Sequence, residues 1–389
     1  MLPVNDPLEA VTHGDPYPYY ARLVAEQPLY YDATLGMWVA TGSAEAAGVL
    51  TSELCRVRPV AEPVPAALAT SPAGVVFRNL VRMNDGERHA AMKRAVSIAL
   101  AAVDLDEAAA SADRWSGPLI AEPAAQGNRT QALDGMAALS VYVVGGLLGI
   151  PDDRLPQLAS WVRDFARCIA PGSNPVELER GGVAAERLSD LLRSLAAVSA
   201  EATDVGLLVS LMKEMRRDEP DGLALIVANA IGFLFQTFDA TAGLIGNTLR
   251  ALIDQPELHA ELSGKPKLLG QALQEVLRYD APVQNTRRFG AEDGVVAGRE
   301  LCAGDVVLVV LAAANRDPAL NPEPDRFDIH RTDRQSLAFS SGPHCCPGTA
   351  LATTVAAAAV GRLLADGVDL AALVDGSAYR PSANARIPL

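Results

Sequence analysis

The sequence predicts a mainly α-helical chain with small β-sheets, an α+β fold in one domain. Three observations lead to this prediction. The stretch from residue 86 to 199 is rich in Ala, Leu and Arg and is broken at only a few points. The segment from about 221 to 253 is apolar on nearly every helical face, as in a helix surrounded by other helices. No internal repeat, low-complexity tail or linker divides the 389 residues into two parts.

The composition excludes several classes of protein. The chain has 33 Lys and Arg against 47 Asp and Glu, and its net charge of −14 has the wrong sign for a nucleic-acid-binding protein. Its 49% share of hydrophobic residues argues against disorder. The first residues lack a basic segment followed by an apolar one, so we expect no secretory signal. Five cysteines, an odd number and few for this length, indicate a reducing compartment, the cytoplasm, and no disulfide framework.

The first half of the chain begins with short elements. Residues 29–41 hold two β-prone runs around a turn, which predicts a hairpin. Residues 57–73 are Pro-rich and predict a loop with short helical turns. In the helical stretch that follows, we expect breaks at Gly117–Pro118, at Gly149–Pro151 and at Pro171–Pro175.

The second half contains the long apolar element. Its uncharged part, residues 222–238, is marginal in length for a membrane span and carries Asn229 and Gln236, so we expect a buried helix. The remaining elements follow in order: a helix over 265–279, β-like runs over 294–314, a proline-punctuated loop over 315–331, and an Ala-rich helix over 351–367 followed by weak strand and turn patterns.

A Gly- and Pro-rich loop from Phe339 to Gly348 places Cys346 just before an expected helix over 349–363. The free N–H groups and the dipole of a helix N-terminus favour a thiolate, so this cysteine can be a nucleophile or a metal ligand. A buried, inert cysteine is an equal alternative on this segment alone. Zinc is disfavoured, because no second Cys/His pair has a suitable spacing.

The loop fits the pattern F-x-x-G-x-H-x-C-x-G-x-x-L-A, which is met by Phe339, Gly342, His344, Cys346, Gly348, Leu351 and Ala352. This pattern resembles the haem-ligand loop of the cytochrome P450 family. The resemblance implies that Cys346 is the thiolate ligand of the haem iron, a ligand that favours O–O cleavage. The spacing selects Cys346 over its neighbour Cys345. Ser340 stands where bacterial members usually carry a second glycine, and we expect it to tighten the loop.

Glu275 and Arg278 are three residues apart, a spacing that alone indicates a surface ion pair. With Arg326 they are similar to the Glu–Arg–Arg structural triad of the family, in the right order before the cysteine. We therefore expect a scaffold role for these three residues and no contact with substrate.

Four cations match the family positions that hold the haem propionates: His89, Lys93, Arg288 and His344. Each alone would be taken as a surface cation. His89 and Lys93 are four residues apart and so share one helix face. Lys93 stands where arginine is usual, which keeps the charge and loses the bidentate fork. The resemblance implies that these residues bind haem b.

The long buried helix departs from the family pattern A-G-x-D/E-T, which leaves room for oxygen and helps to deliver protons. Asp239 keeps the acid, but Ala240 stands at the alcohol position, and Gln236 and Thr237 replace the small pair. Thr241 is one residue late, about 100° around the helix, and cannot simply replace the hydroxyl. Two alternatives stay open. Either the polar groups of Gln236 and Thr237, on the face of Ala240, ordered water or a substrate hydroxyl replace the lost threonine, or Gln236 and Thr237 only pack against neighbouring helices.

The resemblance covers nearly the whole chain and implies a soluble bacterial cytochrome P450 that forms a single domain over residues 1–389. It implies O2- and electron-dependent oxidation of a small organic substrate, such as hydroxylation in secondary metabolism, with a separate ferredoxin and ferredoxin reductase. We expect a cytoplasmic monomer without membrane or nucleic-acid partners, with substrate contacts from residues 57–82, the distal helix and residues 281–286. The alternatives are peroxide-driven oxidation, phenol or aryl coupling, and a non-catalytic haem-thiolate binding protein.

Overall fold

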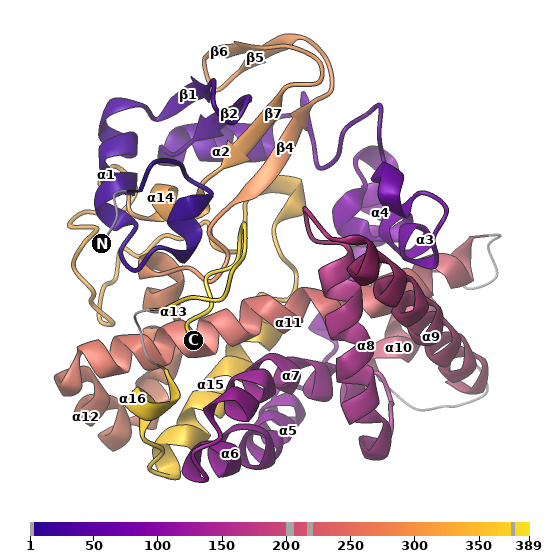
Figure 1. Cartoon of the computed structure of the whole chain (residues 1–389), viewed down its shortest axis with the longest axis vertical. Helices are drawn as coiled ribbons and strands as arrows, with labels where there is room; N and C mark the ends of the chain where they lie inside the picture. The colour runs from indigo at the N-terminus through magenta and orange to yellow at the C-terminus, as the bar shows by residue number, and fades with distance from the viewer. Residues whose placement is uncertain (1–3, 200–205, 216–220, 375–377) are drawn as a thin grey trace.

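The structure, a computed structural model, describes residues 4–199, 206–215, 221–374 and 378–389. Helix α11 (Gly222–Asp254) crosses the molecule, with helices packed around it and the β-strands gathered on one side (Figure 1). This arrangement confirms the predicted fold class, mainly α-helical with small sheets.

Five strands form the larger sheet: β1 (Leu29–Asp32), β2 (Met37–Ala40), β3 (Cys55–Arg56), β4 (Thr286–Gly290) and β7 (Val306–Val309). Their order is β1-β2-β7-β4-β3, and only β2 and β7 pair in parallel. The hairpin predicted over 29–41 is confirmed. Strands β5 (Gly294–Val296) and β6 (Arg299–Leu301) form a separate antiparallel pair.

Short helices surround the sheet: α1 (Tyr17–Glu26), α2 (Ser43–Thr51) and α14 (Leu311–Asn315), with the 3₁₀ turn η1 (Glu9–Thr12) before them. The loop predicted over 57–73 is confirmed, since it contains only the turn η2 (Ala66–Leu68) before α3 (Pro72–Asn79) begins. Helix α14 corrects the β-like prediction for the end of 294–314, because its Ala-rich residues favour a helix once the strand has ended.

The helical stretch after residue 86 is confirmed. It comprises α4 (Gly86–Ala101), α5 (Leu105–Ser116), α6 (Glu122–Ala125), α7 (Arg129–Leu147), α8 (Leu155–Cys168) and α9 (Pro175–Ser199), and α10 (Leu207–Glu214) follows. The break predicted at Gly117–Pro118 is wrong. A π-helical turn, η4 (Gly117–Ala121), joins α5 to α6 without interruption. The wider turn accommodates the proline, which has no N–H for the ordinary helical bond.

Helix α11 is long and apolar enough to cross a membrane by length and composition, yet 61% of its most apolar window is buried inside the protein. It packs against α3, α7, α8, α13 and α15. Its glycines let the C-terminal segment approach closely, since a Cβ on Gly243 would lie 2.9 Å from the Arg386 carbonyl oxygen. The prediction of a buried helix is confirmed.

The remaining elements are α12 (Pro256–Gly264), η6 (Pro266–Leu268), α13 (Leu269–Tyr279), α15 (Thr349–Ala365) and α16 (Leu370–Leu373). Helix α16 was not predicted. Its first turn is capped by the Asp369 carboxylate, which accepts from the Ala372 N–H at 3.1 Å. In the described residues after α16, the β-structure consists of isolated bridges such as Tyr379 with Pro388.

Candidate functional site

The loop before α15 turns tightly around Cys346. The Cys346 N–H donates to the Phe339 carbonyl at 2.8 Å, which closes the loop on itself. Gly342 has φ +67°, and a Cβ there would lie 2.9 Å from Thr51 Cγ2, so only glycine fits. The Gly348 N–H donates to Cys346 Sγ at 3.4 Å at the start of α15. The loop therefore presents this thiol at a helix N-terminus.

The surroundings of the Cys346 thiol act on its charge in opposite directions. Burial raises the pKa of this thiol. The Gly348 N–H, the Lys93 ammonium and the Arg82 guanidinium lower it by less, so the net pKa is raised. The residue Cys346 as a whole is nevertheless exposed. A partly desolvated thiolate with an N–H donor and nearby cations is suited to binding a metal ion, whose charge offsets the desolvation.

Four cations predicted from the sequence lie around this loop. The rings of His89 and His344 are 4.0 Å apart, and His344 Nε2 lies 3.1 Å from the Asp85 carboxylate. Lys93 Nζ donates to the Cys345 carbonyl. Burial, followed by electrostatic interaction with His344 and Lys93, lowers the pKa of His89 to about 4. The structure thus brings α4 and the cysteine loop together through these residues.

Arg288, on β4, is as deeply buried as His89, at 5% exposed. Its side chain donates to the Arg287 carbonyl at 2.9 Å, and burial lowers its pKa. Within the described part of the chain, no carboxylate lies within ion-pair distance of it. The Asp85 carboxylate acts on Arg288 only from beyond that distance and partly offsets the effect of burial on its pKa. A buried guanidinium without a direct ion pair favours an anionic ligand. With one thiol and several cations, the donor set fits haem, which presents an iron and two propionates.

Two arginines near this site were not identified from the sequence. Arg82 lies in the 3₁₀ turn η3 (Val81–Met83), within electrostatic reach of Cys346 and Arg288. Arg380, close to the C-terminus, forms an ion pair with Asp239 of α11. The charges of both were visible in the sequence. The contacts of their side chains could not be predicted, because both residues lie in segments without helical or strand periodicity.

The polar residues of α11 divide between two environments. Gln236, Thr237, Asp239 and Ala240 are half-buried, whereas Thr241 is 1% exposed. Gln236 Nε2 donates to the Gly232 carbonyl at 2.8 Å, and the Thr237 hydroxyl donates to the Leu234 carbonyl at 2.9 Å. The side chains of Gln236 and Thr237 therefore fold back on their own helix, and each keeps an oxygen able to accept a hydrogen bond.

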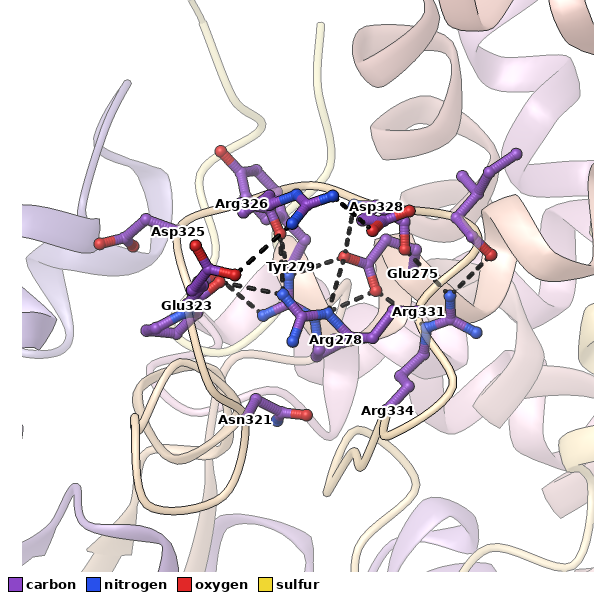
Figure 2. A network of polar contacts seen from close by, with 12 residues as sticks. Glu275, Arg278, Tyr279, Asn321, Glu323, Asp325, Arg326, Asp328, Arg331 and Arg334 are labelled. Carbon is purple, nitrogen blue, oxygen red and sulfur yellow. Dashed lines mark hydrogen bonds and ion pairs between the residues drawn. The ribbon is translucent and has the colours of Figure 1, made fainter.

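Glu275 on α13 is the centre of a buried ionic network (Figure 2). Its carboxylate accepts from Arg278 at 2.7 and 3.1 Å, from Arg334 Nε at 2.8 Å and from the Asp328 N–H at 2.9 Å. Burial raises the pKa of this carboxyl, but these hydrogen bonds outweigh it and the net pKa is lowered. Glu275 and Arg278 have no exposed side-chain surface.

The prediction that Arg326 completes this triad is wrong for its side chain. Arg326 is 61% exposed and pairs with Asp328 and Glu323, while only its carbonyl accepts from Arg278, at 2.9 Å. Figure 2 shows the Arg334 guanidinium directed at Glu275 and that of Arg326 beside Asp328. The residue spacing therefore predicted correctly that the loop around Arg326 contacts Glu275 and Arg278, but not which of its arginine side chains makes the ion pair.

Known proteins resemble this chain in sequence and in structure. The family profile "Cytochrome P450" matches residues 247–366. The cytochrome P450 monooxygenase PikC of Streptomyces venezuelae is 31% identical over 92% of this chain and 85% of its own length. The biotin biosynthesis cytochrome P450 of Bacillus subtilis (strain 168) is 26% identical over 90% and 88%. The crystal structure of CalO2, 27% identical, has a TM-score of 0.84 and covers 100% of this chain and 97% of its own. The chain belongs to the cytochrome P450 family.

Proposed function

We propose that this cytochrome P450 monooxygenase uses haem b, held by Cys346, to oxidise a small organic substrate in bacterial secondary metabolism. The thiol of Cys346 at the N-terminus of α15, beside a cluster of cations with few carboxylates, carries the proposal. When bound, the haem supplies one-electron oxygen chemistry, tuned by its thiolate ligand.

Each residue of the loop and cation cluster has a part in holding this group. Cys346 is the metal ligand, and Phe339, Gly342 and Gly348 shape its loop. The basic residues Lys93, Arg288 and His344 bind the propionates, together with His89, which binds them as a hydrogen-bond donor. This assignment rests on the charge balance, because Asp85 is the one carboxylate that contacts these cations in the described residues. A pyridine haemochrome spectrum of the purified protein tests for haem b, and any other haem type refutes that part of the proposal.

Proton delivery on the distal side is assigned to side chains of α11. Arg380 holds the Asp239 carboxylate in place. Gln236 and Thr237 present acceptor oxygens on the same helix face as Ala240, which has no hydroxyl. The competing interpretation is that Gln236 and Thr237 only pack. Coupling of reductant consumption to product, measured in Thr237→Ala and Gln236→Ala, separates the two: the relay requires lower coupling in at least one variant, and unchanged coupling in both refutes it.

The missing hydroxyl at Ala240 also favours a second candidate, oxidation driven by peroxide or the coupling of phenols or aryl groups. Turnover of a substrate panel with a surrogate ferredoxin and reductase, compared with turnover by hydrogen peroxide, decides between these functions. The main proposal expects product that depends on O2 and reductant. Product formed with peroxide alone, or a coupled product that gains no oxygen atom, supports the second candidate.

We propose separate ferredoxin and ferredoxin reductase as the electron donors, a cytoplasmic location, a monomer, a single domain over residues 1–389, and no membrane or nucleic-acid partner. The relatives support the single domain, since the chain spans 85% of the length of PikC and 97% of that of CalO2. The net charge of −14 argues against binding to nucleic acid.

A further inference from the structure

Helix α11 has one accessible stretch in the middle of its buried length. From Ile226 to Leu249 every residue is buried except four, which are Gln236, Thr237, Asp239 and Ala240. The side chain of Asp239 is 45% exposed, although the helix crosses the molecule and has other helices packed around it (Figure 1). These four residues therefore border an opening in the packing around this helix, the α11 opening.

The C-terminal segment brings Arg380 to the α11 opening. Residues 378–389 fold back on themselves, and the Arg380 N–H donates to the Ile387 carbonyl at 2.9 Å. The returning part of the segment is fixed by Arg386, which donates to the Asp280 carboxylate at 2.8 Å and to three backbone carbonyls near the N-terminus. The backbone that carries Arg380 is thus held in place before any ligand arrives.

The hydrogen-bonding groups of Arg380 are only partly used. Its Nη2 donates to the Asp239 carboxylate, and neither its Nε nor its Nη1 has a hydrogen-bond partner among the described residues. Its side chain is 34% exposed. Arg386, in the same segment, donates from all three of its nitrogens and is 1% exposed. Arg380 therefore has N–H donors to offer beside Asp239, where both side chains are accessible.

The charges at the α11 opening favour a neutral ligand group. Arg380 and Asp239 form an ion pair, so a carboxylate that approached Arg380 would also meet the like charge of Asp239. A neutral carbonyl oxygen accepts from the guanidinium without this repulsion. Hydrogen bonds from a charged donor are also stronger than those between neutral groups.

We propose that Arg380 is a specificity-determining residue that binds a neutral carbonyl group of the substrate, such as that of a ketone, an ester or a lactone. The proposal rests on the proposed function, because the α11 opening includes Asp239 and Ala240, the residues assigned to the distal side. The free N–H groups of Arg380 donate to the carbonyl oxygen, while Asp239 keeps the charge of the pair balanced.

The experiment anchors a carbonyl group on the haem iron, so that the rest of the substrate need not be known. Imidazol-1-yl-alkan-2-ones of increasing chain length are titrated into the haem-loaded protein, beside 1-alkylimidazoles and imidazol-1-yl-alkanoic acids of matched length. Binding is followed by the shift of the haem absorption band. Wild type is compared with Arg380→Gln, Arg380→Lys and Asp239→Asn. The control is Arg250→Gln, because Arg250 and Asp254 form an ion pair of similar exposure, 30% and 49%, elsewhere on α11.

We expect one chain length at which the ketone binds wild type and Arg250→Gln about 10- to 100-fold more tightly than the alkyl probe. Arg380→Gln should lose this preference, and Arg380→Lys should keep part of it. Asp239→Asn leaves Arg380 without its counter-charge, so the acid should become the tightest probe there. The proposal is wrong if wild type prefers the acid, if no chain length shows a ketone preference, or if Arg380→Gln retains it.

Two further measurements separate this proposal from the wider assignment. The ferrous–CO spectrum of wild type reports whether the thiolate ligates haem, and its failure would refute the proposed function itself. A normal spectrum without a ketone preference would refute only the role of Arg380. Thermal unfolding shows whether Arg380→Gln folds, with a midpoint expected to match that of Arg250→Gln. If it does not fold, the change of preference in Asp239→Asn decides alone.

Discussion

The ionic network around Glu275 offers a quantitative test of the scaffold. Glu275→Gln keeps the shape of the side chain but removes its charge, and leaves the guanidinium of Arg278, with no exposed surface, without a counter-ion. Removing one partner of a buried ion pair costs about 3–5 kcal/mol. For 389 residues the unfolding entropy is roughly 0.8 kcal/mol per kelvin, so the midpoint should fall by roughly 4–6 °C.

The same network distinguishes the two arginines that compete for the third position. Arg334→Gln removes a hydrogen bond to a buried carboxylate and should cost about 1.5–3 kcal/mol. Arg326→Gln removes exposed pairs, which contribute about 0–1 kcal/mol. Calorimetry or urea unfolding of the haem-loaded variants measures both. A loss in Arg326→Gln equal to or larger than that in Arg334→Gln would refute the assignment of Arg334 to the network.

Further predictions concern pH, backbone strain and proton delivery. The lowered pKa of Glu275 contributes stability that is complete above pH 4.5, the ordinary glutamate value, and is lost as the pH falls through the pKa of the folded state. Urea unfolding below pH 4.5 should therefore show a steeper loss of unfolding free energy for wild type than for Glu275→Gln. Parallel curves for the two proteins would contradict this. Ser340 has φ +65°, so Ser340→Gly should raise the free energy of unfolding by about 1 kcal/mol, while the control Ser341→Gly, in an extended conformation, should lower it. Arg380→Gln releases the Asp239 carboxylate and should change the pH profile and the solvent isotope effect of turnover with haem content unchanged; identical profiles would leave Arg380 without a positioning role.

The sequence was informative where a pattern is local. The buried nature of α11 followed from apolar residues on all its faces, and the hairpin of β1 and β2 from two β-prone runs around a turn. The thiol of Cys346 at a helix N-terminus followed from a Gly- and Pro-rich loop before an Ala-rich helix. In each case the residues that determine the structure are close in sequence, so their periodicity and turn chemistry are sufficient.

Features that depend on distant contacts could not be predicted. The parallel pairing of β2 with β7 joins Val39 to Leu308, and the sequence holds no signal for it. Arg380 reaches Asp239 across 141 positions of the chain. The choice of Arg334 over Arg326 depends on how an irregular loop turns its side chains, and such loops have no periodicity. The π-turn at Gly117 was missed because proline and glycine usually end a helix.

The central claim is that Cys346 ligates haem iron through its thiolate. The ferrous–CO absorption spectrum measures this directly in wild type, Cys346→Ser and the control Cys345→Ser. Cys345 is adjacent, also exposed, and receives no N–H bond at its sulfur within the described residues. We predict the band of a thiolate-ligated haem in wild type and in Cys345→Ser, and its loss in Cys346→Ser. Retention of that band in Cys346→Ser, or its absence from haem-loaded wild type, would contradict the assignment.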